Sequence, residues 1–160
     1  MKEIKTNAMR ILDSHHICYN CYHYEVEVED ENNLGIKVAR LINKPVDMLF
    51  KTLVTIGQSK NYYVFVIPVA MNLDLKKAAQ SVSEKNVQMI HVKDINQVTG
   101  YIRGGCSPVG MKKQYTTVFD ESVELFDKII ISAGKIGTQM EVDVQQLIDL
   151  VNGKVANITF

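Results

Sequence analysis

Apolar residues recur at helical spacing in four stretches of the chain. In each stretch they are separated by three or four residues, as one buried face of an amphipathic helix requires. The stretches cover residues 8–15, 34–42, 75–82 and 144–151. Thr6, Asp74 and Asp143 stand before three of them as N-cap residues. A shorter helix is expected at 120–126. All of these helices are apolar on one face only and must cover another layer of structure.

Six further runs are rich in β-branched and aromatic residues and are typical of strands. They cover residues 22–28, 49–56, 62–67, 128–132, 138–142 and 155–160. Short glycine-containing segments at 57–61 and 133–137 separate two pairs of runs, so each pair is expected to form an antiparallel hairpin. Because helices and strands interleave without a regular βαβ order, the sequence predicts an α+β fold with a mixed, curved sheet covered by four to five helices.

Composition narrows the class of protein. The 160 residues carry 18 basic and 18 acidic side chains, and 46% of them are hydrophobic. This composition excludes a disordered or low-complexity chain, and the zero net charge argues against a protein that grips a nucleic-acid backbone unaided. No linker-like segment divides the sequence, so residues 1–160 are expected to form a single domain. With no apolar stretch of roughly 18 residues and no signal-peptide pattern, the protein is expected to be cytoplasmic, with no membrane partner.

Lys51 interrupts the 49–56 strand. Alternation places it on one face with Leu49 and Leu53, so its ammonium group lies among apolar neighbours. The commoner interpretation is a lysine whose stem covers its neighbours while its charge reaches water. The functional interpretation is a cation at the mouth of a pocket.

Residues 100–110 contain four glycines. Such a segment exposes backbone N–H groups that can hold a carbonyl oxygen, an oxyanion or a phosphate. A tight connection without a ligand is the alternative. The segment matches neither a P-loop nor a dinucleotide-binding fingerprint, so nucleoside-triphosphate chemistry is not expected.

Cys18 and Cys21 form a C-x-x-C pair close to three histidines. The residues after it alternate like a strand, whereas a redox motif places its first cysteine at a helix N-terminus. A structural zinc site needs a second pair of ligands, which the sequence does not offer. A structural role is therefore favoured, and no metal or cofactor is expected. No nucleophile motif accompanies the histidines, so the sequence indicates a pocket without an obvious catalyst.

Several segments together resemble the YbaK/EbsC family. They are residues 5–8, 50–54, 68–69 with 73–79, 99–110 with 112–113, and 132–137, in the family's order and along nearly the whole chain. The resemblance implies a barrel-like sheet and a stand-alone deacylase that clears mischarged Cys-tRNA(Pro). It also implies roles for individual residues: Lys51 holds the tRNA 3′ end, and the backbone N–H of Gly104 meets the substrate carbonyl. The other pocket residues that it implies are Tyr24, Thr52, Gly105 and Ser132.

Two further pocket positions depart from the family's pattern. Leu34 stands where relatives often have an aromatic residue, and Gln139 where some have a carboxylate. Both are expected to contact the substrate and to affect its selection.

The resemblance also explains the missing catalyst, because the substrate is thought to supply the nucleophile. The thiolate of a cysteinyl ester attacks its own carbonyl, expels the ribose hydroxyl and leaves a thiolactone. The predicted function is therefore trans-editing of Cys-tRNA(Pro), and also of Cys-tRNA(Cys), with prolyl-tRNA synthetase as the expected partner. The alternatives are a water-using deacylase of Ala-tRNA(Pro) and a non-catalytic adaptor that binds a tRNA end or a synthetase.

Overall fold

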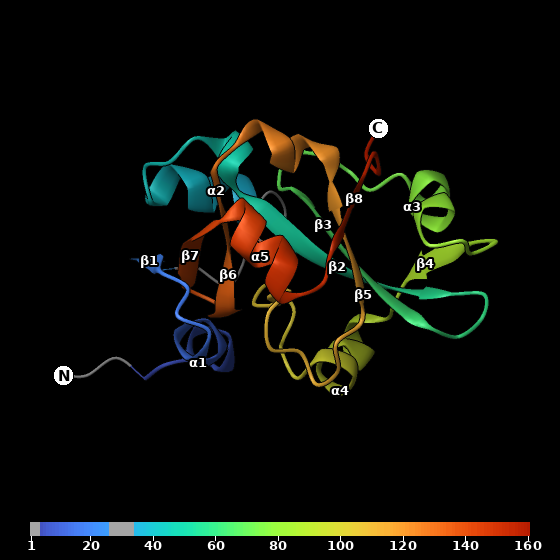
Figure 1. Ribbon diagram of the computed structural model, residues 1–160, viewed down its shortest axis with the longest axis horizontal. Coiled ribbons are helices and arrows are strands. Elements are labelled where there is room, and N and C mark those ends of the chain that lie inside the picture. The colour runs from blue at the N-terminus through green and yellow to red at the C-terminus, as the bar shows by residue number, and fades with distance from the viewer. Residues whose placement is uncertain (1–3, 26–33) are drawn as a thin grey trace.

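The computed structural model describes residues 4–25 and 34–160, and of Leu34 only the backbone. Its strands form two sheets (Figure 1). The three-stranded sheet has the order β1-β7-β6, with β1 at Tyr19–His23, β6 at Lys128–Lys135 and β7 at Thr138–Asp143. The five-stranded sheet has the order β4-β2-β3-β5-β8. Its strands are β2 Phe50–Gly57, β3 Tyr62–Pro68, β4 Val87–Met89, β5 Thr116–Asp120 and β8 Lys154–Ala156.

Five α-helices surround the sheets in the described part of the chain. They are α1 Asn7–Ser14, α2 Leu34–Leu41, α3 Leu75–Ser81, α4 Ile95–Thr99 and α5 Val144–Leu150. Three short 3-10 helices lie at Val46–Met48, Val92–Asp94 and Glu121–Leu125. The helix expected at 120–126 is thus a 3-10 helix, and α4 was not predicted.

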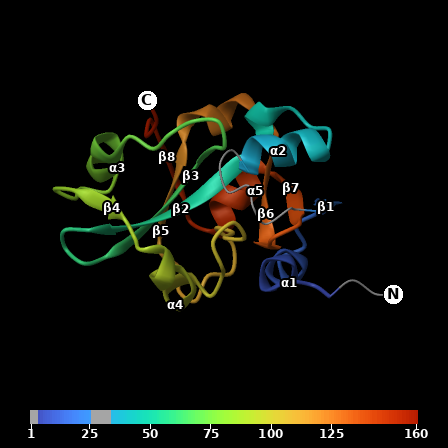
Figure 2. The ribbon, with the colours of Figure 1, turned by 180° about the vertical axis from the view of Figure 1, so that it is seen from behind.

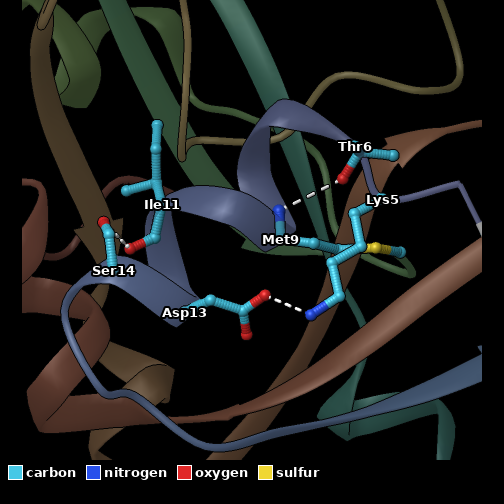
Figure 3. Close-up of polar contacts among 6 residues, drawn as sticks. All are labelled: Lys5, Thr6, Met9, Ile11, Asp13 and Ser14. Carbon is cyan, nitrogen blue, oxygen red and sulfur yellow. Dashed lines mark hydrogen bonds and ion pairs between the residues drawn. The ribbon is translucent and has the colours of Figure 1, made fainter.

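The predicted N-caps are present. Thr6 Oγ1 accepts a hydrogen bond from the Met9 N–H at 3.2 Å (Figure 3). The same hydroxyl donates to the Ala133 carbonyl oxygen at 2.5 Å, so the cap also attaches α1 to β6. Figure 3 also shows the ion pair of Lys5 with Asp13, which spans the helix on its exposed side. At α5, Asp143 accepts from the N–H of Gln146 at 2.9 Å.

The sheet is mixed, as predicted. β2 pairs antiparallel with β3 and β6 antiparallel with β7, which confirms both hairpins. β3 pairs parallel with β5, and β5 with β8. The two sheets approach each other where Leu49 and Ile130 form a parallel bridge between the start of β2 and β6. The α+β class is confirmed, but the barrel is not closed, because the strands are hydrogen-bonded in two separate sheets.

Three apolar clusters hold these layers together. The largest lies between the sheets, α1 and α5, and includes Phe50, Val66, Ile131 and Met140. The second lies between the five-stranded sheet and α3. The third packs Val38 and Ala39 of α2 on Leu49 and Ile130; in Figure 2 α2 lies over the beginning of β6. α2 therefore covers the junction of the two sheets.

The boundaries of several elements differ from the prediction. β1 begins at Tyr19 and ends at His23, and residues 26–28 of the predicted strand lie outside the described residues. β4 and β5 were not predicted. β8 is Lys154–Ala156, so it shares only residues 155 and 156 with the expected 155–160 strand; beyond it Thr159 forms an isolated bridge with Leu73.

Asp120 attaches the end of β5 to the C-terminal segment, and we expect Asp120→Ala to be strongly destabilising. Its buried carboxylate accepts from the Ser122 N–H and hydroxyl at 3.1 and 2.5 Å, the Ile158 N–H at 3.3 Å and the Thr159 hydroxyl at 3.1 Å. The alanine leaves these donors unpaired, at a cost of about 3 kcal/mol or more. Urea unfolding should show this loss; a change below about 1 kcal/mol would contradict it, and Asp149→Ala on the exposed face of α5 is the control.

Candidate functional site

β2 presents Lys51 on the face that carries Leu49 and Leu53, which is turned away from the core between the two sheets. Lys51 pairs with Ile67 of β3, and its side chain is half-buried. Burial lowers the pKa of its ammonium group below the ordinary value, since the charge is partly withdrawn from water. Lys51 makes no hydrogen bond or ion pair with any described residue. Its charge is therefore available to a ligand.

The parallel bridge between β2 and β6 brings Ser132 toward Lys51. Leu49 lies opposite Ile130 in an isolated bridge, two residues before Lys51 in β2 and two residues before Ser132 in β6. Side chains two residues apart on a strand share a face, so both point the same way as the bridge pair. Ser132 Oγ accepts from the Gly134 N–H at 3.1 Å and keeps its own proton to donate.

Gln139 and Tyr24 extend this face across the small sheet. Gln139 pairs with Ser132 on one side and with Tyr22 on the other. Its Nε2 donates a hydrogen bond to Tyr24 Oη at 3.0 Å. We call Lys51, Ser132, Gln139 and Tyr24 the polar band: the last three share one face of the three-stranded sheet, and the Leu49–Ile130 bridge joins that sheet to β2 beside Lys51.

The first turn of α2 lies at the edge of this band. A Cβ added to Gly35 would lie 2.5 Å from Val69 Cβ, so α2 packs directly on the segment that follows β3. Leu34 is the first residue of α2 and stands next to this contact.

The glycine-rich segment packs against the tip of the β6–β7 hairpin. A Cβ on Gly105 would lie 3.2 Å from backbone atoms of Lys135 and Ile136. The Gly105 N–H donates to the Ile102 carbonyl oxygen at 2.9 Å, so it is not available to a ligand. Gly104 adopts a φ of +84°, is exposed, and its N–H meets no acceptor among the described residues. Of the two glycines, Gly104 is the one that can donate to a substrate.

Tyr101 supports this segment from inside. Its hydroxyl donates to the Val109 carbonyl oxygen at 2.6 Å, and its ring lies against Gly110 and Gly134. Burial raises the pKa of Tyr101 to about 12, so the phenol is neutral at physiological pH. We infer a supporting rather than a chemical role.

Thr52 lies on the other face of β2. It pairs with Val66, which belongs to the core between the sheets, and alternation directs its side chain away from that of Lys51. Thr52 Oγ1 is buried and has no hydrogen-bond partner in the described part of the chain. The structure thus brings Thr52 next to Lys51 in sequence but not onto the same face.

Sequence reasoning missed a charged group beside the band. Glu141 lies on the face of Gln139, with Tyr22 Oη 3.4 Å from its Oε1 and Lys44 Nζ 3.9 Å from its Oε2. The pKa of Lys44 is raised by a hydrogen bond between Lys44 itself and Tyr22, and then by the negative charge of Glu141. The sequence signal that could have found Glu141 is a single charged residue between the apolar residues Met140 and Val142. Lys51 stands out in β2 in the same way. Because its two partners hold Glu141, we assign it a structural role.

The described residues contain no group of three His, Cys, Asp or Glu side chains able to hold a metal ion. Cys18 is exposed, Cys21 is half-buried in β1, and neither forms a disulfide. Over the same residues, no helix is long and apolar enough to cross a membrane.

Comparison with known proteins identifies the family. The family model of the aminoacyl-tRNA editing domain matches residues 35–150. The chain belongs to this family. Within it, an Enterococcus faecalis (strain ATCC 700802 / V583) protein named as the Cys-tRNA(Pro)/Cys-tRNA(Cys) deacylase EbsC is 43% identical over 155 residues, which cover 97% of this chain and 93% of that protein. The family resemblance seen in the sequence is confirmed.

Solved structures share this fold. A crystal structure described as a trans-editing enzyme for prolyl tRNA synthetase aligns with a TM-score of 0.79 at 21% identity, over 99% of both chains. The hypothetical protein APE2540 aligns with a TM-score of 0.85 at 17% identity, over 97% of this chain and 100% of its own. At these identities the likeness concerns the fold alone.

Proposed function

We propose that this protein is a trans-editing deacylase that removes Cys from Cys-tRNA(Pro), and also from Cys-tRNA(Cys). The observation that carries the proposal is the 43% identity to a deacylase of that name over nearly the full length of both chains. Membership of the aminoacyl-tRNA editing family supports deacylation as the reaction. We further propose that residues 1–160 act as one editing domain in the cytoplasm, where charged tRNA is used.

The band of polar residues supports this function chemically. In the proposal, the ammonium group of Lys51 holds an anionic or ester oxygen of the tRNA 3′ end. The Gly104 N–H donates to the ester carbonyl oxygen, and the hydroxyls of Ser132 and Tyr24 bind beside it. Fixed donors of this kind stabilise the charge that develops on a carbonyl oxygen during acyl transfer. Leu34, at the start of α2, and Gln139, behind Tyr24, complete the proposed site.

The substrate supplies the nucleophile in this proposal. The cysteinyl thiolate forms a bond to its own carbonyl carbon, the bond from that carbon to the ribose oxygen breaks, and the ribose oxygen takes up a proton. The products are a thiolactone and tRNA with a free 3′ end. The protein then needs only to hold the ester in an attacking geometry and to stabilise the oxyanion.

We propose that prolyl-tRNA synthetase delivers the substrate, since a chain with zero net charge offers few contacts of its own to tRNA phosphates. Four lysines, Lys76, Lys77, Lys112 and Lys113, are candidates for phosphate contacts. Of these, Lys77 is engaged elsewhere, because its Nζ donates to the Thr159 carbonyl oxygen at 2.8 Å. Lys76 is exposed on α3. Lys112 and Lys113 line a groove between α1 and α5, next to the end of the glycine-rich segment.

We expect Lys112→Glu/Lys113→Glu to raise the KM for Cys-tRNA(Pro) about tenfold or more while kcat stays within about twofold of the wild type. The reason is that these side chains are proposed to contact phosphates and not the reacting ester. The salt dependence of binding should weaken by about one unit of slope for each lysine lost. Lys85→Glu, an exposed lysine after α3, is the matched control. A fall in kcat at unchanged KM would contradict the assignment.

The deciding experiment follows release of amino acid from tRNA(Pro) charged separately with Cys, Ala and Ser. Fast release of Cys alone is the expected result. Equal or faster release of Ala would favour the water-using deacylase, and binding without release of any amino acid would favour the adaptor. A second assay adds prolyl-tRNA synthetase; the proposed partnership requires that it lower the KM.

A further inference from the structure

The hydrogen bond between Gln139 and Tyr24 determines what the Tyr24 hydroxyl can do. Gln139 Nε2 is the donor and Tyr24 Oη the acceptor, 3.0 Å apart. A phenol has one proton and also accepts through its oxygen lone pairs. Since the amide of Gln139 uses a lone pair, the proton of Tyr24 stays available to a different acceptor. No described residue accepts it.

Both partners of this hydrogen bond are held in place. Gln139 is only 9% exposed and lies between Ser132 and Tyr22 in the sheet. The Tyr24 N–H donates to the Gly137 carbonyl oxygen at 3.0 Å, which continues the ladder beyond the end of β1. A Cβ on Gly137 would lie 3.1 Å from the Tyr24 carbonyl oxygen, so the two backbones are in close contact. The direction of the Tyr24 hydroxyl is therefore set before any substrate arrives.

Because the Tyr24 hydroxyl can only donate outward, it distinguishes hydrogen-bond acceptors of the substrate from its donors. The α-ammonium group of an aminoacyl ester is a donor, so it does not match an outward O–H of Tyr24. The ester carbonyl oxygen is an acceptor, and it is the atom on which negative charge grows during attack. A donor fixed in advance toward that oxygen lowers the barrier more than it strengthens ground-state binding.

We propose that Gln139 is a positioning residue that makes Tyr24 a hydrogen-bond donor to the ester carbonyl oxygen of the bound aminoacyl-tRNA. Tyr24 and the Gly104 N–H then form the two donors of an oxyanion hole, and Gln139 acts only through Tyr24. This inference rests on the proposed deacylase function. It also explains why a neutral amide suits position 139: a carboxylate there would accept the Tyr24 proton, which would then no longer be available to the substrate.

Gln139→Glu reverses the polarity and is the first test. With Glu at this position, Tyr24 donates to the carboxylate, and kcat for Cys-tRNA(Pro) should fall about 100-fold, as far as in Tyr24→Phe, while KM changes little. The opposite arrangement, in which the amide oxygen accepts the Tyr24 proton, predicts that Gln139→Glu keeps the wild-type kcat. That result would overturn the inference.

A double-mutant cycle provides the second test and does not depend on an added charge. Gln139→Leu should lower kcat about tenfold in the wild-type background, because Tyr24 loses its orientation. In the Tyr24→Phe background the same change should have no further effect. Equal losses in both backgrounds would show that Gln139 acts independently of Tyr24. Gln139→Met, of similar length, replaces the leucine variant if thermal unfolding shows that the latter is not folded.

The wild-type reaction separates the two levels of the proposal. Release of Cys by the wild type together with an uncoupled cycle would overturn the role of Gln139 and leave the deacylase function standing. Absence of Cys release by the folded wild type would overturn the function and this inference with it. Release by the wild type together with full coupling supports both.

Discussion

Lys51→Met should abolish removal of Cys from Cys-tRNA(Pro), with kcat/KM reduced about 100-fold or more. Methionine keeps most of the length and the apolar surface of the lysine stem and removes only the charge. Lys51 has no charged partner among the described residues, so the loss should concern the substrate and not an internal ion pair. Release of radiolabelled Cys under single-turnover conditions measures the effect. Lys128→Met, an exposed lysine at the start of β6, is the matched control.

The same variant should be at least as stable as the wild type. Burial lowers the pKa of Lys51, which means that folding disfavours its charged form. In the pH window between this lowered pKa and the ordinary value of 10.5, the unfolded chain binds more protons than the folded one. Wild-type stability should therefore rise with pH across that window relative to Lys51→Met. An inactive variant with a clearly lower Tm would instead indicate a structural role for Lys51.

The pH profile of the reaction gives an independent check. The charged form of Lys51 is lost as the pH rises through its lowered pKa, so deacylation should decline on the alkaline side earlier than an ordinary lysine would allow. Lys51→Arg keeps its charge throughout this range and should remove the decline, if its larger head still reaches the substrate. If the alkaline decline persisted unchanged in Lys51→Arg, a group other than Lys51 would be its cause.

The helices and hairpins could be predicted because their signals are local. Periodicity and caps such as Asp143 before α5 depend on residues a few positions apart. β5 was missed although Thr116–Phe119 are all β-branched or aromatic, a local strand signal; its partners, β3 and β8, come from distant parts of the chain. β4 has three residues, too few for a strand pattern to show. The strands divide into two sheets because β2 and β6 meet only at the Leu49–Ile130 bridge. That contact joins distant parts of the chain, so no local sequence pattern predicts it.

The site was predictable to the extent that alternation or a family motif marked its residues. Alternation in β2 already separated Lys51 from Thr52, whereas the family resemblance had placed both in one pocket. The hydrogen bond of Gly105 to Ile102, and the Gly104 N–H that meets no acceptor in the described part of the chain, depend on loop conformation, which one glycine-rich sequence does not determine. The contact from Gln139 to Tyr24 joins residues 115 positions apart and needed the register of the three-stranded sheet.

The free thiol of the substrate should be indispensable. We expect S-methylcysteinyl-tRNA(Pro) and Ser-tRNA(Pro) to be released at least about 1000-fold more slowly than Cys-tRNA(Pro), since the methyl group removes the thiolate and a hydroxyl is a far weaker nucleophile at neutral pH. Of the groups on the polar band, Lys51, Ser132, Tyr24 and Gln139, none is a histidine or a carboxylate that could activate water as a general base. Glu141, the carboxylate on the same face as Gln139, is held by Tyr22 and Lys44.

The product distinguishes the two mechanisms directly. Attack by the substrate thiol yields a thiolactone, which mass spectrometry of the quenched reaction detects before it opens, whereas attack by water yields free cysteine at once. Reaction in H₂¹⁸O adds a second criterion, because only the water-using mechanism places ¹⁸O in the amino acid at the moment of release. If S-methylcysteine is released at a rate close to that of cysteine, the nucleophile is water. The search for a base would then begin with Glu141, and Glu141→Gln should abolish that activity while Lys51 and Gly104 keep their roles as binding groups.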